Sequence, residues 1–182
     1  MLVALSIITI SIIFVPASSA SEERPILTGT AAMKMVHGCL AKAASEGWLM
    51  HIAIMDNHAN LKAYHRMDDA QLLSQDVAMA KARSSAVSPR STKKWGESAF
   101  PNGGGPIAAA FVPGIIYFEG GLPIMTADGS HIGGIGVSGD TGANDAICAQ
   151  AGRRSRQRPP ASHSGRQFIT IELVMFNESE ID

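Results

Sequence analysis

Apolar residues recur at the spacing of one helix face near the start of the chain. In residues 28–46 they fall at Met33, Val36, Leu40 and Ala44, which are positions i, i+3, i+7 and i+11. A threonine at the beginning of this stretch can cap a helix, and the glycine after it can end one. The pattern predicts a first helix over residues 28–46.

Alternation at strand spacing follows the predicted helix. The run WLMHIAIMD is apolar, DNHAN is rich in turn formers, and LKAYHRM alternates between two faces. The pattern predicts a β-hairpin. One face of its second arm would carry Leu61, Ala63, His65 and Met67, and the other Lys62, Tyr64 and Arg66.

The second half of the chain predicts further helices and strands. Helical spacing returns in residues 69–87, with a predicted buried stripe of Leu72, Leu73, Val77, Ala80 and Ser84. A short helix and a glycine-rich loop follow, and then three apolar runs, IAAAFVPGIIYFEGG, LPIMT and HIGGIGVSG, with a strong Asp-Gly hairpin signal between the last two. Residues 141–152 open a last helix. The order α-β-β-α-(α)-β-β-β-α predicts an α+β fold, an antiparallel sheet with helices packed on it, and not a doubly wound parallel sheet.

The run GIGVSG, residues 134–139, has the glycine pattern of a dinucleotide-binding loop but lacks its setting. Such a loop opens a βαβ unit, and an acidic residue about 20 positions later holds the ribose. Here prolines stand at that distance. We therefore interpret the segment as a glycine-rich strand. Gly133, Gly134 and Gly136 would admit either a closely packed helix or a flat ligand, and both interpretations stay open.

Composition favours one domain with a packed core and gives no sign of a nucleic-acid partner. The chain has 182 residues, 46% of them hydrophobic, and a formal net charge of −1. Aromatic residues make up 5%, too few for a platform that stacks single-stranded bases.

The first 20 residues carry no charged side chain, and their apolar run ends in Pro16 and small residues. This is the pattern of a secretory signal peptide cleaved after Ala20, so we expect a periplasmic or secreted mature chain without a stable membrane span. No Lys or Arg precedes the apolar run, which leaves an uncleaved anchor or an upstream start as alternatives.

The two cysteines, Cys39 and Cys148, have no Cys or His partner at the spacing of zinc ligands. Export would permit a disulfide between them. Because the sequence does not place their Cα atoms, two buried thiols are the favoured interpretation and a disulfide is the alternative.

An ordered set of short motifs resembles the GlcG/HbpS family of small haem-binding proteins, which includes the C-terminal domain of PduO. GG-x-PI, DG, IGGIGVSG, an Asp and CA-x-AG follow one another in residues 120–152. Upstream, Asp56 with Leu61 and then RMD resembles the family's D-x-x-G-x-L…R-M-D, and AKARS resembles its A-x-K-A-x-[TS]. Two features depart from the family: Ala59 replaces a turn glycine, and RRSRQRPPASHSGR replaces the end of the last helix.

The resemblance covers residues 27–152 and implies a five-stranded antiparallel sheet flanked by helices, with profilin-like layering, and assembly into homo-oligomers. It also implies haem as a cofactor. The expected organisation is a signal peptide over residues 1–20, a GlcG/HbpS-like domain over 21–152, and an atypical basic tail over 153–182.

Haem needs an axial donor in an apolar slot and cationic or hydrogen-bonding groups near its propionates. We place His37 on the apolar side of the first helix, His58 in the hairpin turn and His65 beside Arg66, and take the three histidines as candidate iron ligands. His51, inside an apolar strand, is interpreted as a core histidine. The candidate cofactor-binding set comprises His37, His58, His65, Arg66, Thr92, Gly134 and Gly136, and a small polar cleft is hypothesised from Arg66, Asp68, Lys81 and Thr92.

The sequence therefore predicts an exported haem-binding protein that scavenges, stores or senses haem. One alternative is a cofactor-free isomerase or lyase, or an accessory protein of an oxidative catabolic pathway, because acid–base groups are present at Asp56, His58, His65 and Lys81. Another is a structural partner of a membrane dehydrogenase. No nucleophile elbow or metal-ligand run is present, so a non-enzymatic function is favoured.

Overall fold

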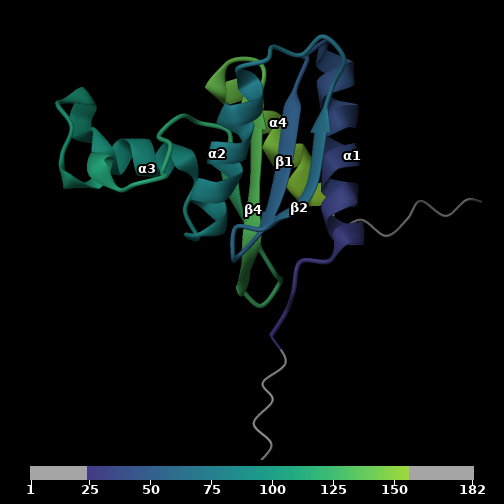
Figure 1. Ribbon diagram of the computed structural model, residues 1–182, viewed down its shortest axis with the longest axis horizontal. Helices are drawn as coiled ribbons and strands as arrows, with labels where there is room; N and C mark the ends of the chain where they lie inside the picture. The colour runs from purple at the N-terminus through teal and green to yellow at the C-terminus, as the bar shows by residue number, and fades with distance from the viewer. Residues whose placement is uncertain (1–23, 156–182) are drawn as a thin grey trace, which may run out of the picture.

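The computed structural model describes residues 24–155, which form a layered α+β body from which one segment projects (Figure 1). The central antiparallel sheet has four strands in the order β2-β1-β4-β3. The strands are β1 (His51–Asp56), β2 (Leu61–Arg66), β3 (Gly121–Met125) and β4 (His131–Ser138). The helices are α1 (Gly29–Glu46), α2 (Ser74–Ala86), α3 (Thr92–Ala99) and α4 (Gly142–Ser155).

One face of the sheet supplies the main core. Ile52 pairs with Val137 and Ile54 with Ile135 across β1 and β4, and all four side chains are buried. This face packs against α1 and α4, which contribute Ala32, Met35, Val36, Cys39, Ala43, Cys148 and Ala149 to the same cluster. The alternation of side chains along β1 and β4 therefore directs the branched residues to this layer and Ala53, Met55, Gly134 and Gly136 to the other.

The opposite face of the sheet explains the glycine-rich strand. Ala53 pairs with Gly136 and Met55 with Gly134, and α2 lies directly over them. A Cβ on Gly136 would overlap the backbone of Ala78 and Ala82, and one on Gly134 would lie 2.5 Å from the Ala82 carbonyl oxygen. Helix packing fills this space, so it accounts for both glycines.

The two predicted hairpins are present, and the first shows the family departure at its turn. Ala59 has a φ of 62°, in the left-handed region that favours glycine. The Asp56 carboxylate holds the turn, because its Oδ1 accepts hydrogen bonds from the backbone N–H groups of His58 at 3.0 Å and Asn60 at 2.9 Å.

The expected fifth strand does not form within residues 24–155. The run IAAAFVPGIIYFEGG gives a 3₁₀ turn over Ala108–Phe111 and then irregular chain. Pro106 and Pro113 each lack a backbone N–H for a strand ladder, and Gly114 has a left-handed φ of 74°. The prediction of five strands is thus corrected to four.

Three helix predictions are also corrected. The buried face of α1 is centred on Cys39, so Met33 and Ala44, predicted to be internal, are exposed. Helix α2 begins at Ser74, so Leu72 and Leu73 precede it and lie on the surface. The last helix continues beyond Gly152, where the sequence suggested the start of a tail.

No helix in the described ranges is long and apolar enough to cross a membrane. The predicted signal peptide and the remainder of the predicted tail, residues 156–182, lie outside the described residues.

Candidate functional site

The outer surfaces of α1 and α4 form an open groove. Its larger hollow has a volume of about 460 Å³ and is lined by Lys42, Ala146, Ile147, Gln150, Ala151 and Arg154. A neighbouring hollow of about 360 Å³ shares Ala151 and Arg154, and its other lining residues are Gly38, Ala41 and Ser155. We call this surface the α1–α4 groove.

Small residues let the two helices approach closely beneath the groove. A Cβ on Gly38 would overlap the Ser155 side chain, and one on Gly152 would lie 2.7 Å from the Met35 carbonyl oxygen. The Ser155 hydroxyl donates a hydrogen bond of 2.7 Å to the Lys34 carbonyl oxygen, which fastens the end of α4 to α1. The sequence G-R-R-S at the end of α4 is therefore part of the folded body.

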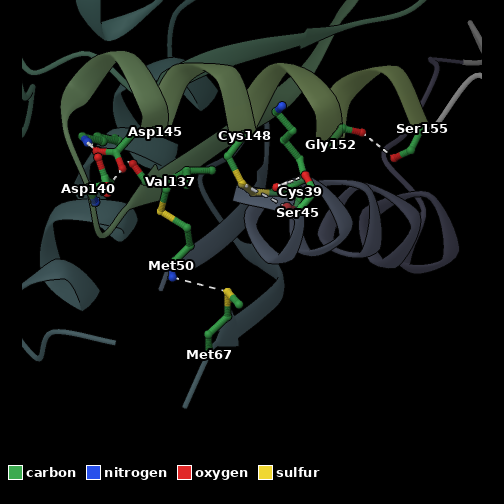
Figure 2. The surroundings of a disulfide bond; sticks show 12 residues. Cys39, Ser45, Met50, Met67, Val137, Asp140, Asp145, Cys148, Gly152 and Ser155 are labelled. Carbon is green, nitrogen blue, oxygen red and sulfur yellow. Dashed lines mark hydrogen bonds and ion pairs between the residues drawn. A yellow bond between two sulfur atoms is a disulfide. The ribbon is translucent and has the colours of Figure 1, made fainter. Parts of the chain in front are cut away.

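A disulfide between Cys39 and Cys148 joins the middle of α1 to α4 (Figure 2). The two Cα atoms are 4.7 Å apart, and both residues are fully buried. The favoured expectation of two buried thiols is therefore wrong, because the helices bring together two cysteines that are 109 positions apart in the sequence. The bond covalently joins the two helices that carry the groove.

Cationic groups flank the groove on both helices. The Lys42 ammonium lies 2.5 Å from the Glu46 carboxylate, in a partly exposed pair of the kind that contributes little to stability. Arg154 is exposed on α4, and the exposed Ile147 lines the same hollow as both cations. The groove thus combines apolar lining residues with two cationic side chains.

His37 lies on the outer side of α1, one turn before Ala41, which lines the groove. The sequence placed His37 on the apolar side of the helix, and this is wrong, because the residue is exposed. His37 is therefore open to solvent, although it lines neither hollow of the groove.

The groups that line the groove, together with the exposed His37 beside it, are of the kinds that bind haem. An exposed imidazole is a usual axial donor, Ile147 and the alanines offer apolar contact to a porphyrin, and Lys42 and Arg154 suit its propionates. The glycine-rich strand does not fit, since α2 occupies the space over Gly134 and Gly136.

The remaining predicted site residues lie elsewhere. His58, in the turn, and His65, on β2, are both exposed and belong to the first hairpin. His65 shares its face of β2 with Ala63, as predicted. Arg66 is also on β2, and its Nη2 donates to the Ala70 carbonyl oxygen at 3.0 Å.

The hypothesised polar cleft is not assembled. Thr92 is buried and accepts a hydrogen bond of 2.9 Å from the Gly121 backbone at the β3 edge of the sheet. Arg66 lies on β2, the opposite edge. Lys81 is 1% exposed and engaged with Asp145, whereas the Asp56 carboxylate is used by the hairpin turn. The groups that suggested acid–base catalysis therefore do not converge on one site.

Sequence reasoning missed Lys42, Ile147 and Arg154 as lining residues. A signal was present: Ile147, Gln150, Ala151 and Arg154 follow helical spacing on the outer face of α4. Within residues 24–155 no group of three or more His, Cys, Asp and Glu side chains is placed to hold a metal ion.

Comparisons with known proteins agree with this fold and with the sequence resemblance. A family model described as "Haem degrading protein HbpS-like" matches residues 27–154. Protein GlcG of Escherichia coli is 35% identical over 117 residues, which are 64% of this chain and 84% of GlcG.

Two solved structures show the same architecture. Protein ORFY of Klebsiella pneumoniae superposes with a TM-score of 0.69 at 27% identity, covering 77% of this chain and 97% of ORFY. PduOC, solved as a heme complex, has a TM-score of 0.64 at 22% identity and covers 72% of this chain and 95% of its own, a likeness of fold. From its motifs, its fold and these matches, the chain belongs to the HbpS-like family within the GlcG/HbpS group.

Proposed function

We propose that this chain is an exported haem-binding protein that scavenges, stores or senses haem, and that the α1–α4 groove is its binding surface. The observation that carries the proposal is the groove, in which Lys42 and Arg154 line one hollow with the apolar Ile147, while His37 stands one helical turn from the lining residue Ala41. The haem-related description of the family and the heme complex of a protein with this fold support the choice of ligand.

Three lining residues of the groove and the neighbouring His37 would hold the haem. His37 supplies the axial imidazole, Lys42 and Arg154 form charge-assisted hydrogen bonds with the propionates, and Ile147 contacts the ring. When bound, haem supplies an iron centre whose reactivity depends on its axial ligand and on the polarity around it.

Export is the second element of the proposal. Disulfides persist in oxidising compartments and are rare in the cytosol. The bond between Cys39 and Cys148 and the signal-like first 20 residues both favour a periplasmic or secreted location. Homo-oligomers remain an expectation of the family resemblance.

Hemin titration of the chain from Ser21 onward tests the proposal. We expect a Soret shift at micromolar hemin, which His37→Ala weakens at least tenfold and which the exposed controls His58→Ala and His65→Ala leave unchanged. The double variant Lys42→Ala/Arg154→Ala should weaken binding while retaining the Soret position, because it leaves the axial donor in place. No Soret shift in the unmodified protein contradicts haem binding, whereas loss only in His58→Ala or His65→Ala contradicts the groove.

A further inference from the structure

The segment from Ala99 to Phe118 leaves the layered body with α3, projects from it and returns to α2, where the Ile116 N–H donates to the Ser84 hydroxyl at 2.9 Å (Figure 1). We call residues 99–118 the arm. No charged residue occurs in the arm, although Glu97 and Glu119 stand close to its two ends. An uncharged projecting segment of this length is unusual on a monomer, because exposed surfaces are normally rich in charge.

Every phenylalanine of residues 24–155 lies on the arm and reaches solvent. Phe111 is 74% exposed, Phe118 64% and Phe100 39%. The core clusters contain no phenylalanine and are closed by Ala, Ile, Met, Val and Leu. The residues that most often fill cores are therefore placed on the projection, and aromatic enrichment with depletion of charge is the composition of an interface centre.

The arm has internal contacts that give it a defined shape. The Ile107 N–H donates to the Ala99 carbonyl oxygen at 2.9 Å, and the Tyr117 hydroxyl donates to the Ala109 carbonyl oxygen at 2.9 Å. Phe100 packs edge-on against Tyr117 with ring centroids 5.8 Å apart. These contacts order the backbone of the arm and the Phe100 ring, so less conformational entropy is lost on association.

The exposed area of the arm is sufficient for a symmetric contact. Ile107 and Val112, which are 48% and 40% exposed, add to the phenylalanines. Since an aromatic side chain presents roughly 150–250 Å², the arm exposes apolar side chains on the order of 500 Å² per copy. Two such surfaces in contact bury about 1,000 Å², the size at which specific interfaces begin.

The charge distribution of the arm allows it to contact the same surface on a second copy of the chain. The arm is neutral, and α3 at its base exposes both Lys94 and Glu97, so a two-fold arrangement can set opposite charges against each other at the rim. We propose that the arm is the contact surface between two copies of this chain. This gives a location to the homo-oligomer of the proposed function and does not depend on haem.

Light scattering coupled to size exclusion, on the haem-free chain from Ser21 onward, tests the arm. We expect the unmodified protein to be a dimer or larger, and Phe111→Asp/Phe118→Asp to be monomeric with an unchanged circular dichroism spectrum. Leu72→Asp is the matched control, because Leu72 is 74% exposed but lies outside the arm, and it should retain the assembly. A monomeric unmodified protein, an assembly that survives in the arm variant, or equal loss in the control overturns the proposal.

A second measurement does not require a charged substitution. Replacing Phe111 by the photo-reactive benzoylphenylalanine keeps an aromatic ring at the position. Irradiation should give a covalent dimer whose cross-linked peptide comes from the arm or α3 of the second copy. Cross-links only within one chain, or only to the surface around Leu72, contradict the proposed contact.

Discussion

The Lys81 ammonium lies 2.6 Å from the Asp145 carboxylate, and both side chains are only 2% exposed. Lys81 comes from α2 and Asp145 from α4, which cover opposite faces of the sheet, so the pair links the two helical layers at the end of β4. Lys81 also donates to the Val137 carbonyl oxygen at 2.9 Å. Burial lowers the pKa of Lys81 and raises the pKa of Asp145, while the attraction between the two groups opposes both shifts.

Removal of one partner of this pair should destabilise the protein strongly. Lys81→Met leaves the Asp145 carboxylate buried without its counter-ion, and such changes cost about 3–5 kcal/mol. The double variant Lys81→Met/Asp145→Leu removes both charges, so we expect it to be more stable than either single variant. Urea unfolding of the unmodified protein, Lys81→Met, Asp145→Leu and the double variant measures the coupling energy between the two side chains. Additive losses of stability would contradict a direct interaction.

Local pattern was sufficient to predict the hairpins and the helical layers. The alternation in LKAYHRM correctly placed Ala63 and His65 on one face of β2 and Tyr64 on the other, because the side-chain period of a strand is fixed. The glycine-rich strand was also identified from the sequence. The sequence did not show whether a helix or a ligand fills the space over Gly136, because α2 lies far from this residue in the chain. Only the folded structure shows that α2 lies there.

The failures concern contacts that local pattern does not encode. Residues 107–118 are as apolar as a strand, yet they lie in the arm. Prolines there and just before would interrupt the backbone hydrogen bonds of a sheet. The Cys39–Cys148 bond and the α1–α4 groove both depend on how two distant helices meet. His37 was assigned to the wrong side of α1 because the exposed Met33 was taken as a marker of the core.

Gly136→Ala should destabilise the fold, because its new methyl group would overlap the backbone of Ala78 and Ala82, which cannot move without displacing α2. Overpacking costs about 1–3 kcal/mol and more where backbone is involved. Gly29→Ala is the control, since no atom lies within 4 Å of its Cβ position at the start of α1. Thermal unfolding of the two variants should show a large loss for the first and none for the second.

The buried His51 should make the protein sensitive to acid. Its Nδ1 lies 2.5 Å from the Tyr64 hydroxyl, and burial lowers the pKa of His51, with the nearby Arg66 charge adding to this effect. As pH falls below about 6.5, the unfolded chain binds a proton at this residue while the folded chain does not. Stability present above that pH is therefore lost on acidification, by up to about 1.4 kcal/mol per pH unit.

Urea unfolding at pH values from about 7.5 to 5, in steps of about half a unit, measures this loss of unfolding free energy. His51→Gln keeps a polar side chain that can pair with Tyr64 but does not titrate, so its unfolding free energy should change less over the same range. An equal pH dependence in both proteins would assign the acid sensitivity to other groups.

Loss of the Cys39–Cys148 bond should lower stability and widen the α1–α4 groove. The bond closes a separation of 109 residues, and cross-links of this span stabilise a fold by about 2–5 kcal/mol, mainly by restricting the unfolded chain. The unfolding free energy of the unmodified protein should differ by that amount with and without a reductant. The variant Cys39→Ser/Cys148→Ser should be as stable as the reduced form, and the reductant should not change its stability. Thiol titration of the unreduced, denatured protein should detect no free cysteine. Two reactive thiols would show that the bond does not form, and would remove its support for an oxidising compartment.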